Sequence, residues 1–400
     1  MSKKSRSKIW FLVHSWLALP VWFFVLIVCV TGTLATVSQE IIWLADPSVR
    51  APKPAEDAER LSFGAVLQKI NEAEPDIKVQ SLSQPHESHF AIRARVSYPD
   101  GSSPTLYVNP YTGDIQGVSP TFDFRQFTRA LHGWWLVPFT NGFSWGWYLV
   151  SFLGLPMLVS LITGLVVYKK FWKGFFSPRL RVRQGARIFW GDFHRLSGIW
   201  SIWFIAVISI TGTWFLIQAL LFDNHISIST EGVPPVIARE DVPQSDDLFA
   251  PPQLSTDEAI ARAIDEIPTL EASSVFLPGN AYSLLFVSGR GWYPLMNQTA
   301  GINPYDGDVE YTRLLSDRSG LEFVTESMRP LHTGDFGGLW IKLIWFFFGL
   351  VLSMMVLSGL LIWSKRTAIA TAKALKKSNQ VNKEQPAPQH ALGQSAEGRA

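Results

Sequence analysis

The fold is decided by a stretch that occurs twice in the chain, "WFLVHSWLALPVWFFVLIVCVTGT" (10–33) and "WGDFHRLSGIWSIWFIAVISITGT" (190–213). Each copy has a histidine near its start and a Thr-Gly-Thr near its end, so that His14 aligns with His194 and Gly32 with Gly212 without a gap. Each apolar run is long enough to cross a bilayer core, which takes about 20 helical residues. We therefore predict two matching membrane helices within an internal duplication.

The composition is that of a membrane protein, because only 17% of the 400 residues are charged, whereas a soluble domain has about a quarter. Runs without charged residues occupy 9–39, 130–168, 196–222 and 343–364. They predict four transmembrane helices, at 9–37, 144–168, 188–222 and 339–364. The first run is much longer than the roughly 7–15 apolar residues of a secretory signal, so we expect a retained anchor.

Lysine and arginine set the expected orientation. The segment 169–187 has seven basic residues and no acidic one, and the N-terminus (1–8) and the tail (365–400) are also basic. By the positive-inside rule these three segments are expected in the cytoplasm of a bacterial cell, with the tail largely disordered. The protein is then expected in the inner membrane, with 38–143 and 223–338 in the periplasm. The net charge of +2 reflects these basic clusters, so no nucleic-acid partner is expected.

The two exterior segments share one pattern. Each has an amphipathic helical stretch, then alternating strands, then a similar turn, "VNPYTGDIQ" (108–116) or "INPYDGDVE" (302–310). Gly in Asn-Pro-Tyr-x-Gly-Asp supplies the positive φ of a hairpin turn. A Leu-His element, "RALHGWW" (129–135) or "RPLHTGDFGG" (329–338), leads into the next membrane helix. The predicted fold is a four-helix membrane protein with two small α+β exterior domains, arranged as a parallel duplication.

Four histidines recur at matched depths. His14 and His194 are expected near the cytoplasmic face, and His132 and His332 near the exterior face. Paired imidazoles across a helix bundle are what bis-histidine ligation of haem iron requires. Zinc or copper sites need three or four ligands, and the single cysteine excludes a Cys-x-x-Cys-His attachment of c-type haem. The sequence therefore predicts two haems, one near each face.

Five further residues are candidates for contacts with these haems. Gly32 and Gly212 lack a side chain, which allows either the approach of a macrocycle or close helix packing. Arg129, Arg195 and Arg329 stand three, one and three positions from a histidine, and are candidate partners of haem propionates. Positive-inside anchoring explains Arg195 equally well.

The repeated "H…TGT" helix, the "NPYxGD" turn and the "LH" element resemble the PepSY-associated transmembrane family over about 8–366. The exterior segments look like PepSY domains, and the siderophore-iron reductases of the FoxB and PiuB type are the closest functional model. This resemblance implies b-type haems on His14, His132, His194 and His332, and reduction of exterior ferric chelates. The chain has no dinucleotide-binding motif, so a cytoplasmic protein or a membrane quinol is the expected electron donor.

The expected function is therefore an enzymatic one, haem-dependent reduction of a periplasmic ferric siderophore or other ferric chelate with release of Fe(II). Two alternatives stay open. The exterior domains could bind or inhibit an exterior protease from a membrane anchor, which leaves the cytoplasmic-side histidines unexplained. A metal or chelate transporter is the other, although the predicted helix cores contain no charged residue to bind a substrate.

Overall fold

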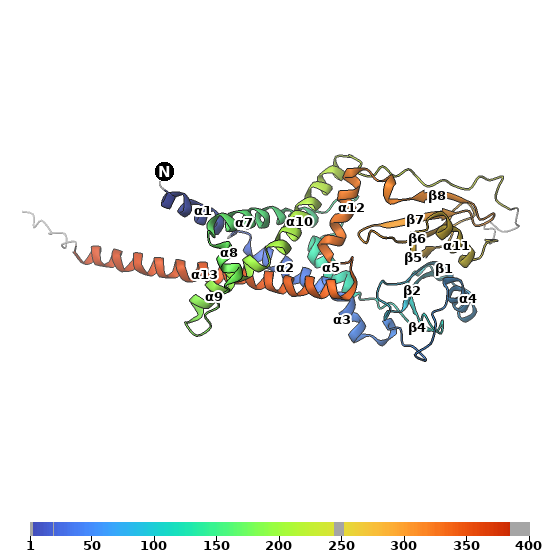
Figure 1. The fold of residues 1–400 in the computed structure, drawn as a ribbon, viewed down its shortest axis with the longest axis horizontal. Coiled ribbons are helices and arrows are strands. Elements are labelled where there is room, and N and C mark those ends of the chain that lie inside the picture. Colours follow the sequence, from blue (N-terminus) through green and yellow to red (C-terminus); the bar gives the residue numbers. More distant parts are fainter. Residues whose placement is uncertain (1–2, 19, 244–251, 385–400) are drawn as a thin grey trace, which may run out of the picture.

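The computed structural model describes residues 3–18, 20–243 and 252–384. Helices gather at one end of an elongated molecule and a β-sheet lies at the other, as Figure 1 shows. Three helical segments are long and apolar enough to cross a membrane, Trp145–Val167, Ile202–Asp223 and Gly338–Lys373. The bent pair Ile9–Leu17 and Trp22–Thr36 makes a fourth if it is one span. The chain is thus a membrane protein with an α+β part.

The first predicted helix, 9–37, is broken. Helix α1 (Lys3–Ala18) and helix α2 (Trp22–Thr36) meet at an angle of 63°. Pro20 lies in the break, where its missing N–H and its ring interrupt an α-helix. His14 is on α1, and Gly32 is on α2.

The third predicted helix, 188–222, is also two helices, α9 (Ala186–Trp200) and α10 (Ile202–Asp223), which meet at Ser201. Only α10 qualifies as a span. Helix α9 is more polar and buries Asp192, which forms ion pairs with Arg181 and Arg195. The predicted helix 188–222 is thus divided at Ser201 into a more polar and a more apolar part.

The second and fourth spans differ in their ends. Helices α6 (Trp145–Phe152) and α7 (Gly154–Val167) form the second span, and the short α8 (Phe171–Phe176) follows. Helix α13 (Gly338–Glu384) continues well past residue 364 and projects beyond the bundle (Figure 1). Residues 365–384, in the tail expected to be largely disordered, are helical here, and their Ala and Lys favour a helix. Its remainder, 385–400, lies outside the described residues.

All strands belong to one antiparallel eight-stranded sheet in the order β4-β3-β2-β1-β5-β6-β7-β8. The halves join where β1 pairs with β5, with Leu82 opposite Val275. The two exterior segments therefore share one sheet and are not the two separate domains predicted from the sequence. The pairing of β1 with β5 leaves neither strand as an unprotected edge. The strands are β1 (Lys78–Ser83), β2 (Ile92–Ser97), β3 (Thr105–Val108), β4 (Ile115–Val118), β5 (Glu271–Phe276), β6 (Leu285–Arg290), β7 (Asn297–Ile302) and β8 (Val309–Arg313).

One face of the sheet is covered by the two predicted amphipathic helices, α4 (Phe63–Ala73) and α11 (Thr256–Glu266). Serine caps begin both helices, and Asp257 of α11 accepts hydrogen bonds from Ser62 and from the backbone N–H of Gly64. The predicted hairpin turns are present, with positive φ at Gly113 and Gly307. The sheet part therefore has two packed cores, one under each helix.

The other face of the sheet looks toward the helix bundle. Between them lie α3 (Ser38–Ala45), α5 (Phe124–Trp134) and α12 (Gly320–Thr333) (Figure 1). Two short 3₁₀ turns, η1 (Pro47–Val49) and η2 (Leu315–Asp317), precede β1 and α12 in the chain. A buried Lys342 of α13 pairs with Glu40 of α3 at 3.0 Å and with Glu87 of the β1–β2 loop at 2.7 Å. This cluster fastens the sheet part to the bundle.

Candidate functional site

The structure brings the four histidines together as two facing pairs. The ring centroids of His14 and His194 are 6.4 Å apart, and those of His132 and His332 are 6.0 Å apart. His14 is on α1, His194 on α9, and the other two lie in the last turns of α5 and α12. Each pair thus takes one histidine from the first half of the chain and one from the second.

These separations suit a metal between two imidazoles. Imidazole nitrogen binds a transition metal at about 2 Å. Two nitrogens on opposite sides of one ion are then about 4 Å apart, and their ring centroids roughly 6 Å apart. Among the described residues, no group of three or more His, Cys, Asp or Glu side chains could hold an ion. The donor set is therefore two imidazoles per site, which suits a metal whose other ligands come from a macrocycle.

In two of the histidines a backbone carbonyl fixes the tautomer. Nδ1 of His132 lies 3.0 Å from the Val28 carbonyl of α2, and Nδ1 of His194 lies 3.1 Å from the Met355 carbonyl of α13. A carbonyl oxygen only accepts, so both Nδ1 atoms carry the proton and donate. Nε2 is left with its lone pair, the form in which histidine binds a metal.

The other two histidines reach the same state through hydroxyl groups. Nδ1 of His14 is 3.0 Å from Thr163 Oγ1, and Nδ1 of His332 is 2.7 Å from Thr211 Oγ1. Each threonine hydroxyl donates to a carbonyl of its own helix, at 2.8 Å for Thr163 and 2.7 Å for Thr211. Since that proton is used, the oxygen accepts from the histidine. All four Nε2 atoms are therefore available as ligands.

A hydroxyl–glycine dipeptide faces each of the four paired histidines. Thr31-Gly32 and Thr211-Gly212 were noticed in the sequence, but two equivalents were missed. They are Thr163-Gly164, beside His14, and Ser358-Gly359, whose serine oxygen lies 3.0 Å from His194 Nδ1. The matched segments "GLPMLVSLITGL" (154–165) and "GLVLSMMVLSGL" (349–360) are the signal that could have revealed them.

The two predicted glycines have different surroundings. A Cβ on Gly32 would lie 2.6 Å from Cε1 of His132, so only glycine allows the ring to stand against α2. Gly212 instead packs against Gly154 of α7, with 3.7 Å between its ideal Cβ and the Gly154 Cα. Close helix packing is thus the observed role of Gly212. Both glycines line the cavity beside the outer pair.

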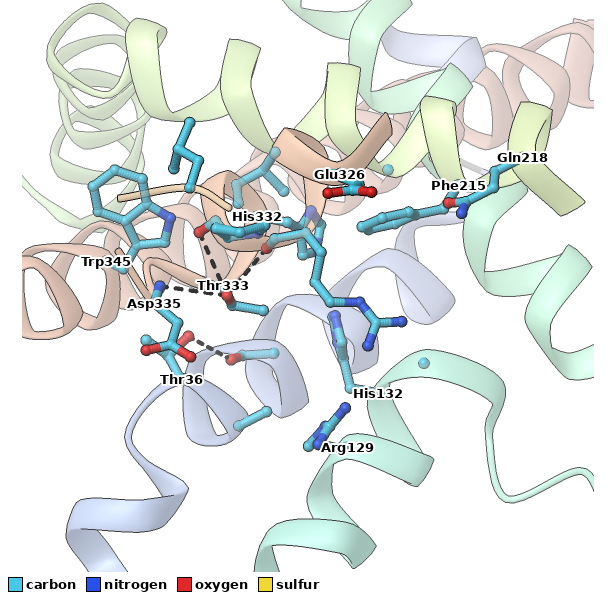
Figure 2. A pocket seen from close by; sticks show the side chains of 18 of the residues that line it. Thr36, Arg129, His132, Phe215, Gln218, Glu326, His332, Thr333, Asp335 and Trp345 are labelled. Carbon is cyan, nitrogen blue, oxygen red and sulfur yellow. Dashed lines mark hydrogen bonds between the residues drawn. The ribbon is translucent and has the colours of Figure 1, made fainter. Parts of the chain in front are cut away.

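A cavity of about 1020 Å³ opens beside His132 and His332, the outer pair. Figure 2 shows the two rings approaching from different helices, with Phe215 against His332 and Arg129 near His132. The ring centroids of Phe215 and His332 are 5.2 Å apart. The cavity extends to strands β6, β7 and β8, so it joins the outer pair to the bundle-facing side of the sheet. Its volume is at the upper end for sites that hold cofactor-sized molecules.

The three predicted arginines separate into two groups. Arg129 and Arg329 line the outer cavity, where they remain candidates for propionate contacts. Arg195 forms an ion pair with the buried Asp192, which also pairs with Arg181 at 2.7 Å. The structure therefore gives Arg195 a carboxylate partner from its own helix.

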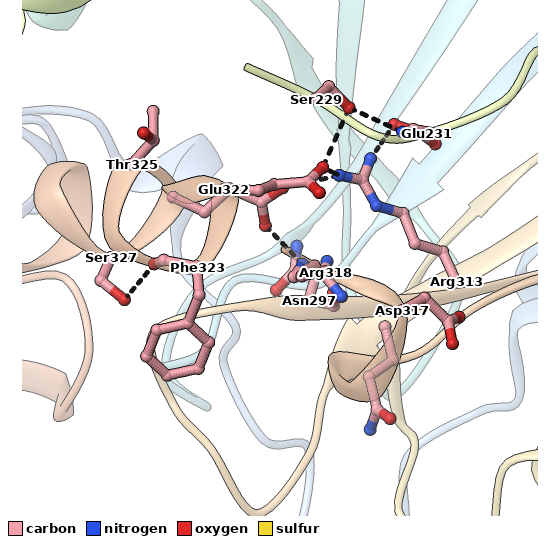
Figure 3. A network of polar contacts seen from close by, with 12 residues as sticks. Ser229, Glu231, Asn297, Arg313, Asp317, Arg318, Glu322, Phe323, Thr325 and Ser327 are labelled. Carbon is pink, nitrogen blue, oxygen red and sulfur yellow. Dashed lines mark hydrogen bonds and ion pairs between the residues drawn. The ribbon is translucent and has the colours of Figure 1, made fainter. Parts of the chain in front are cut away.

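A polar network fixes the helix that carries His332. Figure 3 shows Glu322, in the first turn of α12, surrounded by Arg313 and Ser229. Glu322 is 2% exposed; it pairs with Arg313 and accepts hydrogen bonds from the hydroxyls of Ser229 and Thr230 at 2.9 and 2.6 Å. Burial alone raises the pKa of Glu322, but these hydrogen bonds and Arg313 outweigh it and lower the pKa to about 2. The network holds α12 against β8 and the segment after α10.

The two pairs are stacked along α13. Trp345 Nε1 donates to the Leu331 carbonyl, next to His332, whereas the Met355 carbonyl accepts from His194. The ten residues from Trp345 to Met355 rise about 15 Å in an α-helix. Between these levels lies an apolar cluster with an aromatic group of Trp203, Phe204, Trp345 and Phe348. The sites are close together and separated by packed apolar side chains.

Comparison with known proteins gives one result. No curated protein sequence matches the chain. The model of the PepSY-associated TM region matches residues 11–366, which include all four paired histidines, both sets of strands and most of every candidate span. The chain therefore belongs to the PepSY-associated transmembrane family.

Proposed function

We propose that this protein is a di-haem electron-transfer protein of the bacterial inner membrane that reduces a ferric chelate on the sheet side. One observation carries the proposal: two facing histidine pairs, with all four Nδ1 atoms engaged and all four Nε2 atoms available. His14 and His194 hold the inner haem b, and His132 and His332 hold the outer one. Bound haem supplies reversible one-electron chemistry at its iron.

The side chains provide ligation, tautomer control and an apolar interval between the sites. The hydroxyls of Thr163 and Thr211, and the carbonyls of Val28 and Met355, orient the rings and raise their basicity as ligands. The apolar cluster around Phe204 and Trp345 lies between the pairs, and both side chains also line the inner end of the outer cavity. Electron transfer becomes steeply slower with distance, so sites stacked along one helix favour direct exchange.

The proposed topology has four spans, with the two halves of the chain as parallel repeats and the broken α1–α2 pair as the first span. The N-terminal helix, the basic loop 169–187 and the basic end of α13 all lie at the end of the molecule away from the sheet (Figure 1). Arg366 of α13 stacks on the Phe11 ring of α1 there, 4.7 Å from its centroid. By the positive-inside rule this end is cytoplasmic and the sheet is periplasmic.

The acceptor is a ferric chelate such as a ferric siderophore, which takes one electron and releases Fe(II). The donor is a cytoplasmic protein or a membrane quinol. His132 and His332 would together leave a bound haem iron without an open coordination position, so the acceptor would bind the protein and not the metal. The cavity beside the outer pair, open toward the sheet, offers the space for it.

The test uses protein reconstituted in vesicles with the sheet side outward. Dithionite-reduced protein should be reoxidised by added ferric siderophore, and an Fe(II)-binding dye outside should capture the product. His332→Ala should abolish this reaction while the inner site still reduces. Equal iron reduction by His332→Ala and wild type would overturn the proposal.

A further inference from the structure

Charge around the outer cavity is strongly unbalanced. Seven cationic and three anionic side chains line it. Four of these cations are in ion pairs: Arg290, Arg313, Arg318 and Lys342. The other three are Arg125, Arg129 and Arg329, and none of them has a carboxylate partner within 4.0 Å in the part of the chain that the structure describes. The cavity is thus built to attract anions.

Arg125 lines two cavities, whereas Arg129 and Arg329 line only the larger one. Arg125, Arg129 and His132 follow each other on α5 at spacings of four and three, so they lie on one helix face. Arg125 is about 6 Å further from the histidine than Arg129 along the axis. It also borders a second, smaller cavity of about 240 Å³, between α3, β2, β3 and the start of α5.

The smaller cavity contains a second arginine without an ion pair. Arg93 of β2 lies on the bundle-facing side of the sheet, between Ile92 and Ala94, which are buried in the opposite core. No carboxylate comes within 4.0 Å of its guanidinium among the described residues. Burial and the nearby charge of Arg125 lower the pKa of Arg93, while Tyr107, Asp123 and Glu87 act in the opposite direction.

Asp123, the acidic side chain that lines the smaller cavity, already caps a helix. Its Oδ1 accepts from the Gln126 backbone N–H at 3.0 Å and caps α5. The remaining polar lining consists of Thr105, Tyr107, Ser119 and Gln39. Two neighbouring guanidiniums held partly out of water without a paired anion cost free energy. An anionic ligand between them would remove that cost.

We propose that Arg93 and Arg125 form a carboxylate-binding subsite that docks an anionic ferric chelate at the entrance of the outer cavity. This inference rests on the proposed function for the identity of the metal. A guanidinium matches a carboxylate through two parallel hydrogen bonds. A cavity of about 240 Å³ accepts one carboxylate arm, and the bulk of the chelate then faces Arg129, Arg329 and the outer histidines. The substrate class is a polycarboxylate chelate of Fe(III).

The test measures binding without redox chemistry. Gallium(III) citrate, a redox-inert polycarboxylate chelate, is titrated calorimetrically into the purified full-length protein. Arg93→Gln and Arg125→Gln should each weaken binding about tenfold, the size expected for one charge-assisted hydrogen-bonded contact. Arg125→Lys should recover part of the loss. The matched control is Arg95→Gln, which removes an exposed arginine two positions along the same strand that lines neither cavity.

The outcomes separate this inference from the proposed function. Haem content is read from the visible spectrum of every sample. Absence of gallium citrate binding to wild type, or equal binding by wild type and both Gln variants, would overturn the subsite whatever the haem content. A gallium hydroxamate chelate without carboxylates that bound as tightly and showed the same arginine dependence would overturn the substrate class. Arginine-dependent binding in a protein without haem would support the subsite and overturn the electron-transfer function.

Discussion

Substitution of one glycine should remove the outer haem, and the matching substitution in the other half should not. In Gly32→Ala the new methyl carbon would lie 2.6 Å from Cε1 and 2.9 Å from Nδ1 of His132. Carbon atoms in contact are about 3.5–4.0 Å apart, so the ring has to move away by about 1 Å. Such a displacement exceeds the roughly 0.5 Å within which a ligand set must be held. It also breaks the hydrogen bond from Nδ1 to Val28.

The magnitude follows from two opposing effects. Overpacking typically costs about 1–3 kcal/mol, whereas Ala in place of Gly within a helix gains up to about 1 kcal/mol. Gly32→Ala should therefore fold. Its haem affinity at the outer site should be about 10–100-fold lower, as when the hydrogen-bond partner that orients a metal ligand is removed. Gly212→Ala places its methyl carbon at an ordinary 3.7 Å from Gly154, so it should keep full haem content.

The assay is haem per polypeptide together with the reduced-minus-oxidised visible spectrum of each purified variant. Gly32→Ala should lose one of the two spectral components and keep the other. Full occupancy of both sites in Gly32→Ala would refute the reasoning from ring contact. Equal loss in Gly212→Ala would show that Gly212 also contacts a cofactor.

Three further predictions concern tautomer control, acid stability and topology. Thr211→Val removes the acceptor of His332 Nδ1 and should lower outer haem affinity about 10–100-fold, whereas Thr31→Val, whose hydroxyl bonds only to its own helix, should not. Glu322 has a pKa of about 2 in the folded protein against an ordinary 4.5. Its ionised form therefore stabilises the fold fully above pH 4.5, and this stabilisation is lost as pH falls toward 2. Glu322→Gln should lower the free energy of unfolding by about 3–5 kcal/mol at neutral pH, and thermal unfolding of this variant should depend less on acid pH. A reporter fused after Lys170 should be cytoplasmic and one after Asp223 periplasmic; the reverse result would invert the proposed orientation.

Much of the arrangement could be predicted because it follows from local pattern. Apolar length gave the spans, amphipathic spacing gave α4 and α11, and Asn-Pro-Tyr-x-Gly-Asp gave the two hairpins. The pairing of each histidine with its counterpart in the other half followed from matched depth. These features depend on residues close in sequence or on the repeat itself.

The remaining features depend on contacts that no local pattern contains. The pairing of β1 with β5 joins the sheets of the two exterior segments at their edge strands. The sequence of either strand alone is equally compatible with an unpaired edge. The different surroundings of Gly32 and Gly212 arise because α5 approaches α2 more closely than α12 approaches Gly212. The repeat of 154–165 in 349–360 singles out Thr163 and Ser358. Which histidine each of them contacts depends on the packing of α7 on α1 and of α13 on α9.

The central claim is that the four histidines form two separate axial-ligand pairs. The most direct test compares haem content and low-temperature reduced spectra of His14→Ala, His194→Ala, His132→Ala and His332→Ala with those of the wild type. The wild type should contain two haems per polypeptide. His14→Ala and His194→Ala should lose the same spectral component, and His132→Ala and His332→Ala the other. A wild type without haem, or loss of one shared component in both His14→Ala and His132→Ala, would contradict the account.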